Sequence, residues 1–227
     1  MISGDDQAVK ETSGGSLKER AYKIIRENII SCRLAPGSVL NEKELVRAIG
    51  ASRTPIREAL SRLEQEKLVI IVPQRGTFVS EITAKTINDV YQVREILEPC
   101  LVRLATPLIA TAELEAMRDE FLRLTPDDYD TAIAADDAFH SRIVSLSNNT
   151  YLIQLMENMY AQNERIRSLM IRFVPQRLKE TCDEHLAVVE AMLRRDAEQA
   201  AEAMRQHMIS ARRAAFMYGA GTGAARQ

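Results

Sequence analysis

From Thr83 to about Tyr218 the sequence keeps one pattern: apolar residues recur at helical spacing, without a convincing strand signal. This pattern constrains the fold most strongly, because helices with apolar stripes must bury them against one another. Breaks in the pattern occur near Ala110, Thr125–Pro126, Asn148–Asn149 and Val174–Pro175, and more weakly at Arg195–Asp196. These breaks predict an all-α bundle of about six helices over residues 83–218.

Residues 16–80 predict a different, smaller domain of three helices and a β-hairpin. The Pro36–Gly37 turn is expected to end the first helix. Asn41 with Glu44 has the spacing of a capping box for the second helix, and Gly50 is expected to stop it. Ser52 is expected to cap the third helix. Two apolar stretches, 68–72 and 77–79, flank a Gly-containing loop and predict the hairpin. The fold class is therefore mainly α, with an N-terminal winged helix-turn-helix followed by an all-α bundle.

The remaining segments, 1–15 and 219–227, predict flexible tails, since they are rich in Gly or polar residues. Of the 227 residues 46% are hydrophobic, which is enough for a core, yet no apolar run is long enough for a membrane span. Three widely spaced cysteines offer neither a disulfide framework nor a CxxC metal site. We therefore expect a cytoplasmic protein with no membrane partner.

The charge is divided unevenly along the chain although the formal net charge is only −2. Residues 16–80 hold 12 Lys and Arg against 7 Asp and Glu, whereas residues 81–227 hold 17 against 22. The difference is thus five positive charges in the first segment and five negative charges in the second. A basic segment joined to an acidic one indicates a polyanion-binding module attached to a module that does not touch the polyanion.

The third predicted helix carries the best candidates for reading DNA bases. Its apolar stripe leaves Arg53 and Arg57 together on the opposite face, near the helix N-terminus. Arginine suits bidentate contact with guanine O6 and N7. The apolar stripe consists of Ile56, Ala59, Leu60 and Leu63.

Flanking residues are candidates for contacts with the DNA backbone. Ser52 and Thr54 can donate to phosphate from the first turn, while Lys43 and Arg75 are expected beside the passing backbone or minor groove. Any one of these charges alone could be an ordinary solvated side chain. The helix, turn, helix and wing in sequence favour the DNA-binding interpretation.

All three histidines of the chain lie in the second domain, each on an apolar stripe of a different predicted helix. His140 shares its stripe with Asp136, four residues earlier, whereas His185 and His207 lie on two other helices. A single core histidine is usually just a hydrogen-bonded core residue. Three histidines with one carboxylate instead indicate a divalent metal site inside a helical bundle, with zinc, nickel, cobalt or manganese all compatible. Asp137 is a competing candidate for the carboxylate ligand of this site. Cys182 is a possible extra ligand that we interpret as a small buried hydrophobe.

Arg94 lies on the apolar stripe of the first helix of the second domain, and a buried arginine needs an anion. Its partner could be Glu98 or Asp136, or it could be the carboxylate of a bound ligand. An open metal position beside Arg94 would form a pocket for a small organic acid.

The stretch APGSVLNEKELVRAIGASRTPIREALSRLEQEKLVIIVPQRGTFV resembles the winged helix-turn-helix of the GntR superfamily of bacterial transcription regulators. The resemblance implies DNA contacts at Lys43, Ser52, Arg53 and Arg57, with wing contacts at Arg75 and Gly76. A glycine at the wing tip lets the backbone approach the groove closely.

The second domain resembles the helical FCD domain of the FadR subfamily of GntR regulators, in its shorter VanR-type branch. The matching stretches are VREILEPCLVRLA, DDAFHSRIVSLSNN and EHLAVVEAMLRRDAEQAAEAMRQH. The resemblance implies metal ligands at Asp136, His140, His185 and His207, dimerisation through this domain, and a small carboxylate effector rather than an acyl-CoA.

The sequence thus predicts a homodimeric repressor, not an enzyme, that binds a pseudo-palindromic double-stranded operator and responds to a small carboxylate. The expected cofactor is a divalent metal, with zinc first and nickel, cobalt or manganese as alternatives. Arg94 is the expected effector-binding residue. Two alternatives stay open, namely a metal site that is purely structural and a metal-dependent enzyme. The enzyme is disfavoured because no motif supplies a catalytic base.

Overall fold

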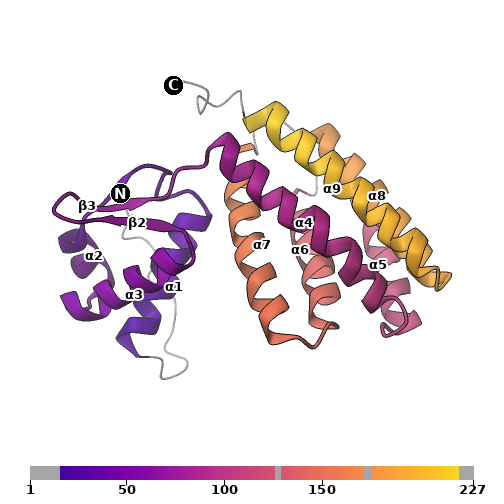
Figure 1. Ribbon diagram of the computed structural model, residues 1–227, viewed down its shortest axis with the longest axis horizontal. Helices are drawn as coiled ribbons and strands as arrows, with labels where there is room; N and C mark the ends of the chain where they lie inside the picture. The colour runs from indigo at the N-terminus through magenta and orange to yellow at the C-terminus, as the bar shows by residue number, and fades with distance from the viewer. Residues whose placement is uncertain (1–15, 126–128, 171–174, 220–227) are drawn as a thin grey trace. The chain divides into compact units, whose positions relative to one another are not determined.

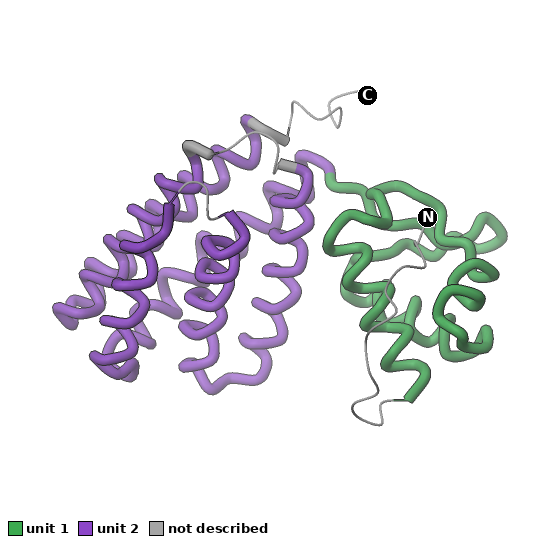
Figure 2. The backbone as a smooth tube through the Cα atoms, turned by 180° about the vertical axis from the view of Figure 1, so that it is seen from behind, with its two compact units in different colours: residues 1–82 green, residues 83–227 purple. Residues whose placement is uncertain are grey.

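The computed structural model describes residues 16–125, 129–170 and 175–219, and the chain divides into two compact units, residues 1–82 and 83–227 (Figure 2). The predicted tail 1–15, and all of the predicted tail 219–227 except Gly219, lie outside the described residues, as do Pro126 and Val174. No described helix combines the length and the apolarity needed to cross a membrane.

The first unit contains three helices, α1 (Leu17–Ile30), α2 (Glu42–Ile49) and α3 (Arg53–Gln65) (Figure 1). The prediction that Pro36–Gly37 ends the first helix is wrong, because α1 ends at Ile30. Two residues later Cys32 adopts a left-handed φ of 55°, which an α-helix cannot continue through. The buried faces of the three helices enclose a core that includes Ile25, Ile29, Leu45, Ile49, Ile56, Leu60 and Leu63.

The turn between α2 and α3 follows from three local features. Asn41 is the N-cap of α2, but its side chain accepts from the Lys43 backbone, and the Glu44 carboxylate accepts from the Asn41 side-chain amide at 3.2 Å. The predicted capping box is therefore replaced by a related arrangement, in which Glu44 bonds to the side chain of Asn41 and not to its backbone N–H. Gly50 ends α2 with a left-handed φ of 71°, as glycine allows. Ser52 is the N-cap of α3 but makes no capping hydrogen bond with its side chain.

The wing is a three-stranded antiparallel sheet of β1 (Val39–Leu40), β2 (Val69–Val72) and β3 (Gly76–Val79) in the order β1-β3-β2. The hairpin of β2 and β3 pairs Ile70 with Phe78. The strand β1 is not recognisable from the sequence, because two residues are too few to show strand alternation. At the wing tip Gly76 has a φ of 115°, a backbone conformation that favours glycine.

The second unit is all-α over its described residues and consists of six helices, as predicted. They are α4 (Ala84–Ala105), α5 (Thr111–Arg123), α6 (Tyr129–Ser145), α7 (Thr150–Met170), α8 (Pro175–Leu193) and α9 (Ala197–Gly219). α4 and α8 both pack against α9, and α6 lies between α5 and α7 (Figure 1). The core lies between the helices and includes Phe121, Phe139, Met156, Val188 and Met204. Leu104, which continues the apolar spacing of α4 near its C-terminal end, is 55% exposed and does not join this core.

Candidate functional site: a recognition helix and a buried histidine cluster

The polar face of α3 has the exposure that a recognition helix requires. Arg53, the first residue of α3, and Arg57, one turn later, are both exposed, while the apolar side of the helix is buried. Because Ser52 makes no capping bond, its hydroxyl at the helix N-terminus remains available for phosphate. Lys43 near the start of α2 is exposed as well. The predicted base-reading and phosphate-contacting residues of this region thus all face solvent.

Arg57 has a partner that sequence analysis missed. Its Nε donates to the carboxylate of Glu42, the first residue of α2, at 3.0 Å. Because the Arg57 side chain is still 66% exposed, the ion pair orients the guanidinium without removing it from the surface. On the wing Arg75 and Gly76 are exposed, and a Cβ built on Gly76 would meet nothing within 4 Å.

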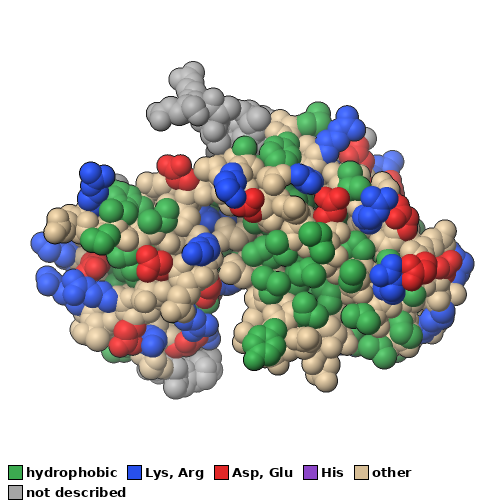
Figure 3. Space-filling model, in the orientation of Figure 1, with side chains coloured by type: hydrophobic (Ala, Val, Ile, Leu, Met, Phe, Trp, Pro, Cys, Tyr) green, Lys and Arg blue, Asp and Glu red, His purple; other side chains and the backbone are tan. Residues whose placement is uncertain are grey.

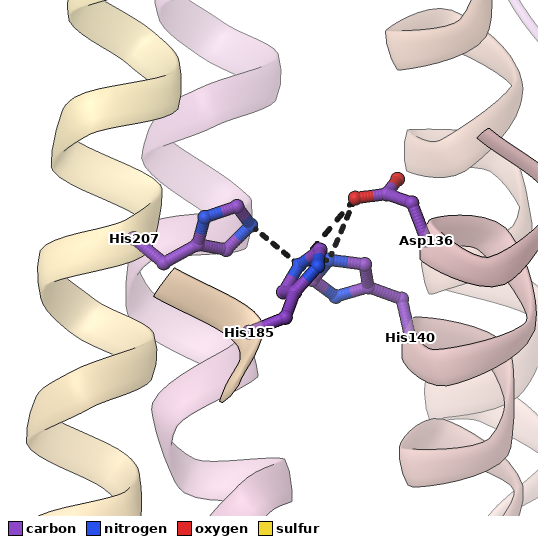
Figure 4. Close-up of side chains that lie close together, drawn as sticks. All are labelled: Asp136, His140, His185 and His207. Carbon is purple, nitrogen blue, oxygen red and sulfur yellow. Dashed lines mark hydrogen bonds and ion pairs between the residues drawn. The ribbon is translucent and has the colours of Figure 1, made fainter. Parts of the chain in front are cut away.

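Three helices of the second unit bring all three histidines together with one aspartate. Asp136 and His140 come from α6, His185 from α8 and His207 from α9, and their ligand atoms lie within 4.8 Å of one another (Figure 4). His185 Nε2 lies 3.2 Å from His140 Nε2, 3.1 Å from His207 Nε2 and 3.4 Å from an Asp136 oxygen. Two ligands of one zinc ion, each about 2.0–2.2 Å from it, are separated by roughly 3.0–3.5 Å. The three distances from His185 Nε2 therefore match the spacing of ligands around one metal ion.

The positions of the hydrogens on the imidazole nitrogens also favour a cation in the cluster. The Nδ1 atoms of His140 and His207 face the carboxylates of Glu98 and Glu184, so each must carry its hydrogen on Nδ1. When both rings are neutral, as metal binding requires, their Nε2 atoms present lone pairs to His185 Nε2. His185 can offer at most one hydrogen there, and its own Nδ1 is buried without a hydrogen-bond partner among the described residues. A cation among the three nitrogens satisfies all their lone pairs at once.

The supporting carboxylates are themselves held by arginines. Burial raises the pKa of Glu98, but Arg94, whose Nε donates at 2.7 Å, and His140 outweigh burial and lower it to about 2. Glu184 accepts from His207 Nδ1 at 2.6 Å and from Arg177 at 2.7 Å. Burial raises the pKa of Glu184, whereas these two partners lower it to about 2. Both carboxylates are therefore anionic at neutral pH and fix the orientation of their imidazoles.

Asp136 has its own cationic partner. Arg167 of α7 donates to Asp136 and to Asp137, both at 2.6 Å. Asp136 is therefore the carboxylate that joins the cluster, and Asp137, the competing candidate, contacts the arginine instead. Burial raises the pKa of Asp136, but His140, His185 and Arg167 hold it below its usual range. Burial also lowers the pKa of His185 and that of His207, which keeps these imidazoles in the neutral form that binds metals.

A cavity of about 120 Å³ opens beside the cluster, with Asp136, His185 and His207 in its wall. Since one water needs roughly 10–15 Å³ of such volume, the cavity is large enough for a small organic molecule. Most of its surface is apolar, and three arginines interrupt this surface. These are Arg94, Arg167 and Arg177.

The structure therefore brings together the four predicted metal-ligating residues and places Arg94 on the adjoining cavity wall. Arg94 is paired with Glu98, one of the two protein partners considered for it. Cys182 lines the cavity but is outside the cluster. The positions of Glu184, Arg167 and Arg177 beside the cluster were not predicted from the sequence. A signal existed for the pair Arg177 and Glu184, which lie seven residues apart and hence on one side of α8.

The fold and the two sites define a class of protein: a winged-helix DNA-binding protein with a helical second domain that contains a buried cluster of three histidines and one aspartate. Residues 17–79 match the family model described as bacterial regulatory proteins, gntR family, and residues 89–210 match the FCD domain. The chain belongs to the GntR family and carries a C-terminal FCD domain. It is a DNA-binding transcriptional regulator, and its fold and relatives are those of regulators rather than enzymes.

Similar proteins span most of the chain. The HTH-type transcriptional repressor RspR of Escherichia coli K12 is 27% identical over 198 residues, covering 85% of this chain and 86% of RspR. The Nta operon transcriptional regulator of Aminobacter aminovorans is 31% identical over 183 residues, covering 79% of this chain and 85% of that protein. Among solved structures, E. coli McbR/YncC has a TM-score of 0.75 at 22% identity, covering 90% of this chain and 99% of McbR/YncC.

Proposed function

We propose that this protein is a homodimeric, metal-dependent repressor whose DNA affinity responds to a small carboxylate bound beside the histidine cluster. The observation that carries the proposal is the convergence of three imidazole Nε2 atoms and one Asp136 oxygen within 4.8 Å. The role as a repressor is supported by relatives named as repressors, among them RspR.

In this proposal Asp136, His140, His185 and His207 hold a divalent ion, with zinc first and nickel, cobalt or manganese as alternatives. The bound ion supplies positive charge and coordination positions that the four protein ligands do not fill. The protein supplies the orientation of each ligand, through Glu98 and Glu184 for two of the imidazoles.

The charges around the cavity support an anionic effector that binds only the metal-loaded protein. Three guanidinium groups, those of Arg94, Arg167 and Arg177, pair with five carboxylates. With neutral imidazoles the carboxylates exceed the arginines by two, so the metal-free site has a net negative charge and disfavours an anion. A divalent ion cancels this excess and offers its own positive charge to a carboxylate ligand. The five carboxylates belong to Glu98, Asp136, Asp137, Glu180 and Glu184.

The direct test is DNA affinity, measured by fluorescence anisotropy with the full chain in metal-free and zinc-loaded form, with and without a panel of small carboxylates. We expect a carboxylate to change the affinity of the zinc-loaded protein by about fivefold or more, and to leave the metal-free protein unaffected. His185→Ala, which removes one ligand, is expected to lower zinc content and to abolish the response. Stoichiometric zinc without any response would make the site structural, and a metal-free, unresponsive protein would overturn the proposal.

At the DNA, we propose that Arg53 and Arg57 read bases, that Lys43 and Ser52 contact the backbone, and that Arg75 and Gly76 contact it from the wing. The exposure of all six residues supports these roles. Arg57→Ala should weaken operator binding by about 1 to 3 kcal/mol and relax specificity at one base. Arg118→Ala in the second unit removes an arginine of α5 and is the matched control. Equal losses in both variants would remove Arg57 from the recognition surface.

The homodimer is supported by an apolar face on the second unit. Figure 3 shows hydrophobic side chains gathered over α4 and α7, where Tyr151 is 86% exposed. A dimer across this face would present two recognition helices to the half-sites of a pseudo-palindrome. The exposed residues of this face are Ile96, Leu104, Leu108, Tyr151 and Leu155.

Sedimentation analysis tests this interface. The wild-type chain is expected at twice its mass of 25.5 kDa, whereas Ile96→Glu, with a charge in the apolar face, should shift the population to monomers. Leu122→Glu changes an equally exposed leucine on α5 and should leave the dimer intact. A monomeric wild-type protein would overturn the dimer, and a dimeric Ile96→Glu variant would place the interface elsewhere.

A further inference from the structure

The ion pair between Arg57 and Glu42 joins the two helices of the helix-turn-helix on their exposed side. α2 and α3 pack against each other (Figure 1), and Glu42 is the first residue of α2, whereas Arg57 lies one turn into α3. The Arg57 side chain is 66% exposed and the Glu42 side chain 32% exposed. Ion pairs this exposed to water add little to the stability of a fold. Because the pair lies among the residues proposed to contact DNA, its consequence is to be sought in DNA binding.

The pair leaves a defined part of the guanidinium group free. Both carboxylate oxygens of Glu42 accept from Nε of Arg57, at 3.0 and 3.3 Å. The two terminal nitrogens of Arg57 make no hydrogen bond within the described part of the chain. Those nitrogens carry four N–H donors, and two parallel donors of an arginine match O6 and N7 of guanine. Glu42 thus holds the guanidinium group by its inner nitrogen while the edge that can read guanine stays open.

Arg53 differs from Arg57 in this respect. It is exposed at the start of α3, and it makes neither an ion pair nor a hydrogen bond with its side chain among the described residues. A free arginine loses many rotamers when it binds DNA, and it can also turn to a phosphate. Arg57 is held before DNA arrives, so it loses less conformational entropy on binding. The preference for guanine should therefore be stronger at the base pair beside Arg57 than at the one beside Arg53.

Glu42 also limits what Arg57 can contact on other sequences. Phosphates attract an arginine on DNA of any sequence. Moving the Arg57 guanidinium group to a phosphate breaks the pair and leaves the Glu42 carboxylate unpaired beside a negatively charged backbone. On a guanine the pair stays intact, because the terminal nitrogens make the contact. Glu42 therefore opposes binding to unrelated DNA more than binding to the operator, and such a difference increases specificity.

We infer that Glu42 is a positioning residue that sets the base specificity of this regulator. It holds Arg57 with its terminal nitrogens free for O6 and N7 of one guanine, and it keeps Arg57 away from phosphates. The inference rests on the proposed function, since Arg57 is the residue proposed to read a base. Arg57 supplies the contact, and Glu42 determines on which sequences the contact forms.

The test starts from the preferred site of the full chain, selected from a library of random duplex DNA. Fluorescence anisotropy at one fixed salt concentration then gives the dissociation constants for this duplex, for its single base-pair variants and for an unrelated duplex. The base pair at which Arg57→Ala loses its preference is the one beside Arg57. If Arg57→Ala loses its preference at no base pair, the proposed reading role of Arg57 is overturned, and the inference with it.

Glu42→Gln keeps the shape of the side chain and removes its charge. At the base pair assigned to Arg57, the preference for guanine should fall about fivefold or more. The preferences at other base pairs should stay unchanged, and the affinity for the unrelated duplex should rise. An unchanged preference at the Arg57 base pair would overturn the inference and leave the proposed reading role of Arg57 standing.

Glu44→Gln is the matched control for the lost charge. Glu44 is an exposed carboxylate in the same first turn of α2, where it bonds to the side chain of Asn41 and not to Arg57. Its removal should raise the affinity for all duplexes alike and leave the preference at the Arg57 base pair unchanged. An equal loss of this preference in Glu44→Gln and Glu42→Gln would assign the effect to charge alone and overturn the positioning role.

Glu42→Asp separates the contact from the charge in the opposite way. It keeps the negative charge but carries it on a side chain one carbon shorter, which weakens the contact with Nε of Arg57. The preference for guanine should therefore fall in Glu42→Asp although the charge at this position is retained. Full retention of the preference in Glu42→Asp would show that the contact with Nε does not set it, and would overturn the inference.

Discussion

The three imidazoles of the cluster are supported in different ways. His140 and His207 each face a carboxylate, whereas His185 is fixed by packing, with its ring centroid 5.1 Å from that of Phe121 and 5.0 Å from that of Phe139. A ring held by a carboxylate has one defined tautomer and greater basicity. A ring held by aromatic packing has a fixed position but no such electronic support. The supporting carboxylates should therefore influence metal affinity more than their distance from the ion suggests.

Glu98→Gln tests the first of these carboxylates. Loss of the anion beside His140 Nδ1 should weaken zinc binding by about 10- to 100-fold, as is typical for such supporting groups. Competition with a chromophoric chelator measures the change. Glu113→Gln is the control, because Glu113 pairs with Arg142 outside the cluster. Equal zinc affinity in the Glu98 variant and the wild type would contradict a supporting role.

A tyrosine in the DNA-binding unit provides a pH-dependent test. Tyr22 donates to Glu66 at 2.7 Å, and burial, followed by the nearby Glu66 carboxylate, raises the pKa of Tyr22 to about 12. Above pH 10 the unfolded chain ionises this hydroxyl while the folded chain keeps it neutral, so stability falls between pH 10 and 12. Tyr22→Phe lacks this hydroxyl. The free energy of unfolding of Tyr22→Phe should therefore be lower than that of the wild type by about 1 kcal/mol at pH 8. Denaturant titrations should show this difference shrinking between pH 10 and 12. A difference that stays constant over this range would contradict the raised pKa of Tyr22.

The sequence predicted that the three histidines and Asp136 lie together, but only part of their surroundings. The histidines and Asp136 were recognisable because each is a polar interruption of an apolar stripe, a pattern within a single helix. Glu184 precedes His185 on α8 yet supports His207 on α9, a pairing that depends on how two helices pack. The spacing of apolar residues identifies the inward face of each helix but not the partner residue on the neighbouring helix. The role of these carboxylates in supporting the imidazoles was therefore not predictable.

At the level of elements, the orientation of α3 depends on the turn that follows α2. Gly50 has a φ of 71°, and a Cβ at this position would meet nothing within 4 Å. Gly50→Ala should therefore cost only the backbone penalty of a left-handed alanine, about 1 kcal/mol, without a steric clash. Faster amide hydrogen exchange in α2 and α3 would report this loss, and Ala48→Gly in the exposed part of α2 is a control for general helix destabilisation. Unchanged exchange in Gly50→Ala would contradict the expected strain.

Element boundaries show where sequence patterns stop being informative. The six helices of the second unit were predictable because long amphipathic segments end at recognisable breaks, such as Arg195, which has a φ of 60° between α8 and α9. The first helix ends six residues before Pro36, at a turn around Cys32 that carries no Gly or Pro signal. The strand β1 depends on pairing with β3, which lies far along the chain.

For the whole molecule, metal removal should affect the two units unequally. The four residues of the cluster come from α6, α8 and α9, so an ion held by them would link three helices of the second unit and none of the first. Dialysis against a chelator should accelerate hydrogen exchange in these three helices and lower the temperature of their unfolding, and added zinc should reverse both changes. Exchange in α1–α3 should stay constant. Equal changes in both units would contradict a metal site confined to the second unit.

Among the described residues, every group of the proposed metal site and its cavity lies after Thr83, on helices α4 to α9. The proposed ligand-sensing residues are therefore encoded by one continuous segment of the gene, separate from the residues proposed to contact DNA. Under the proposed function, joining residues 83–227 to the winged helix of a different regulator should transfer the response and redirect it to a new operator. The same separation would make the second unit a portable input for genetically encoded biosensors.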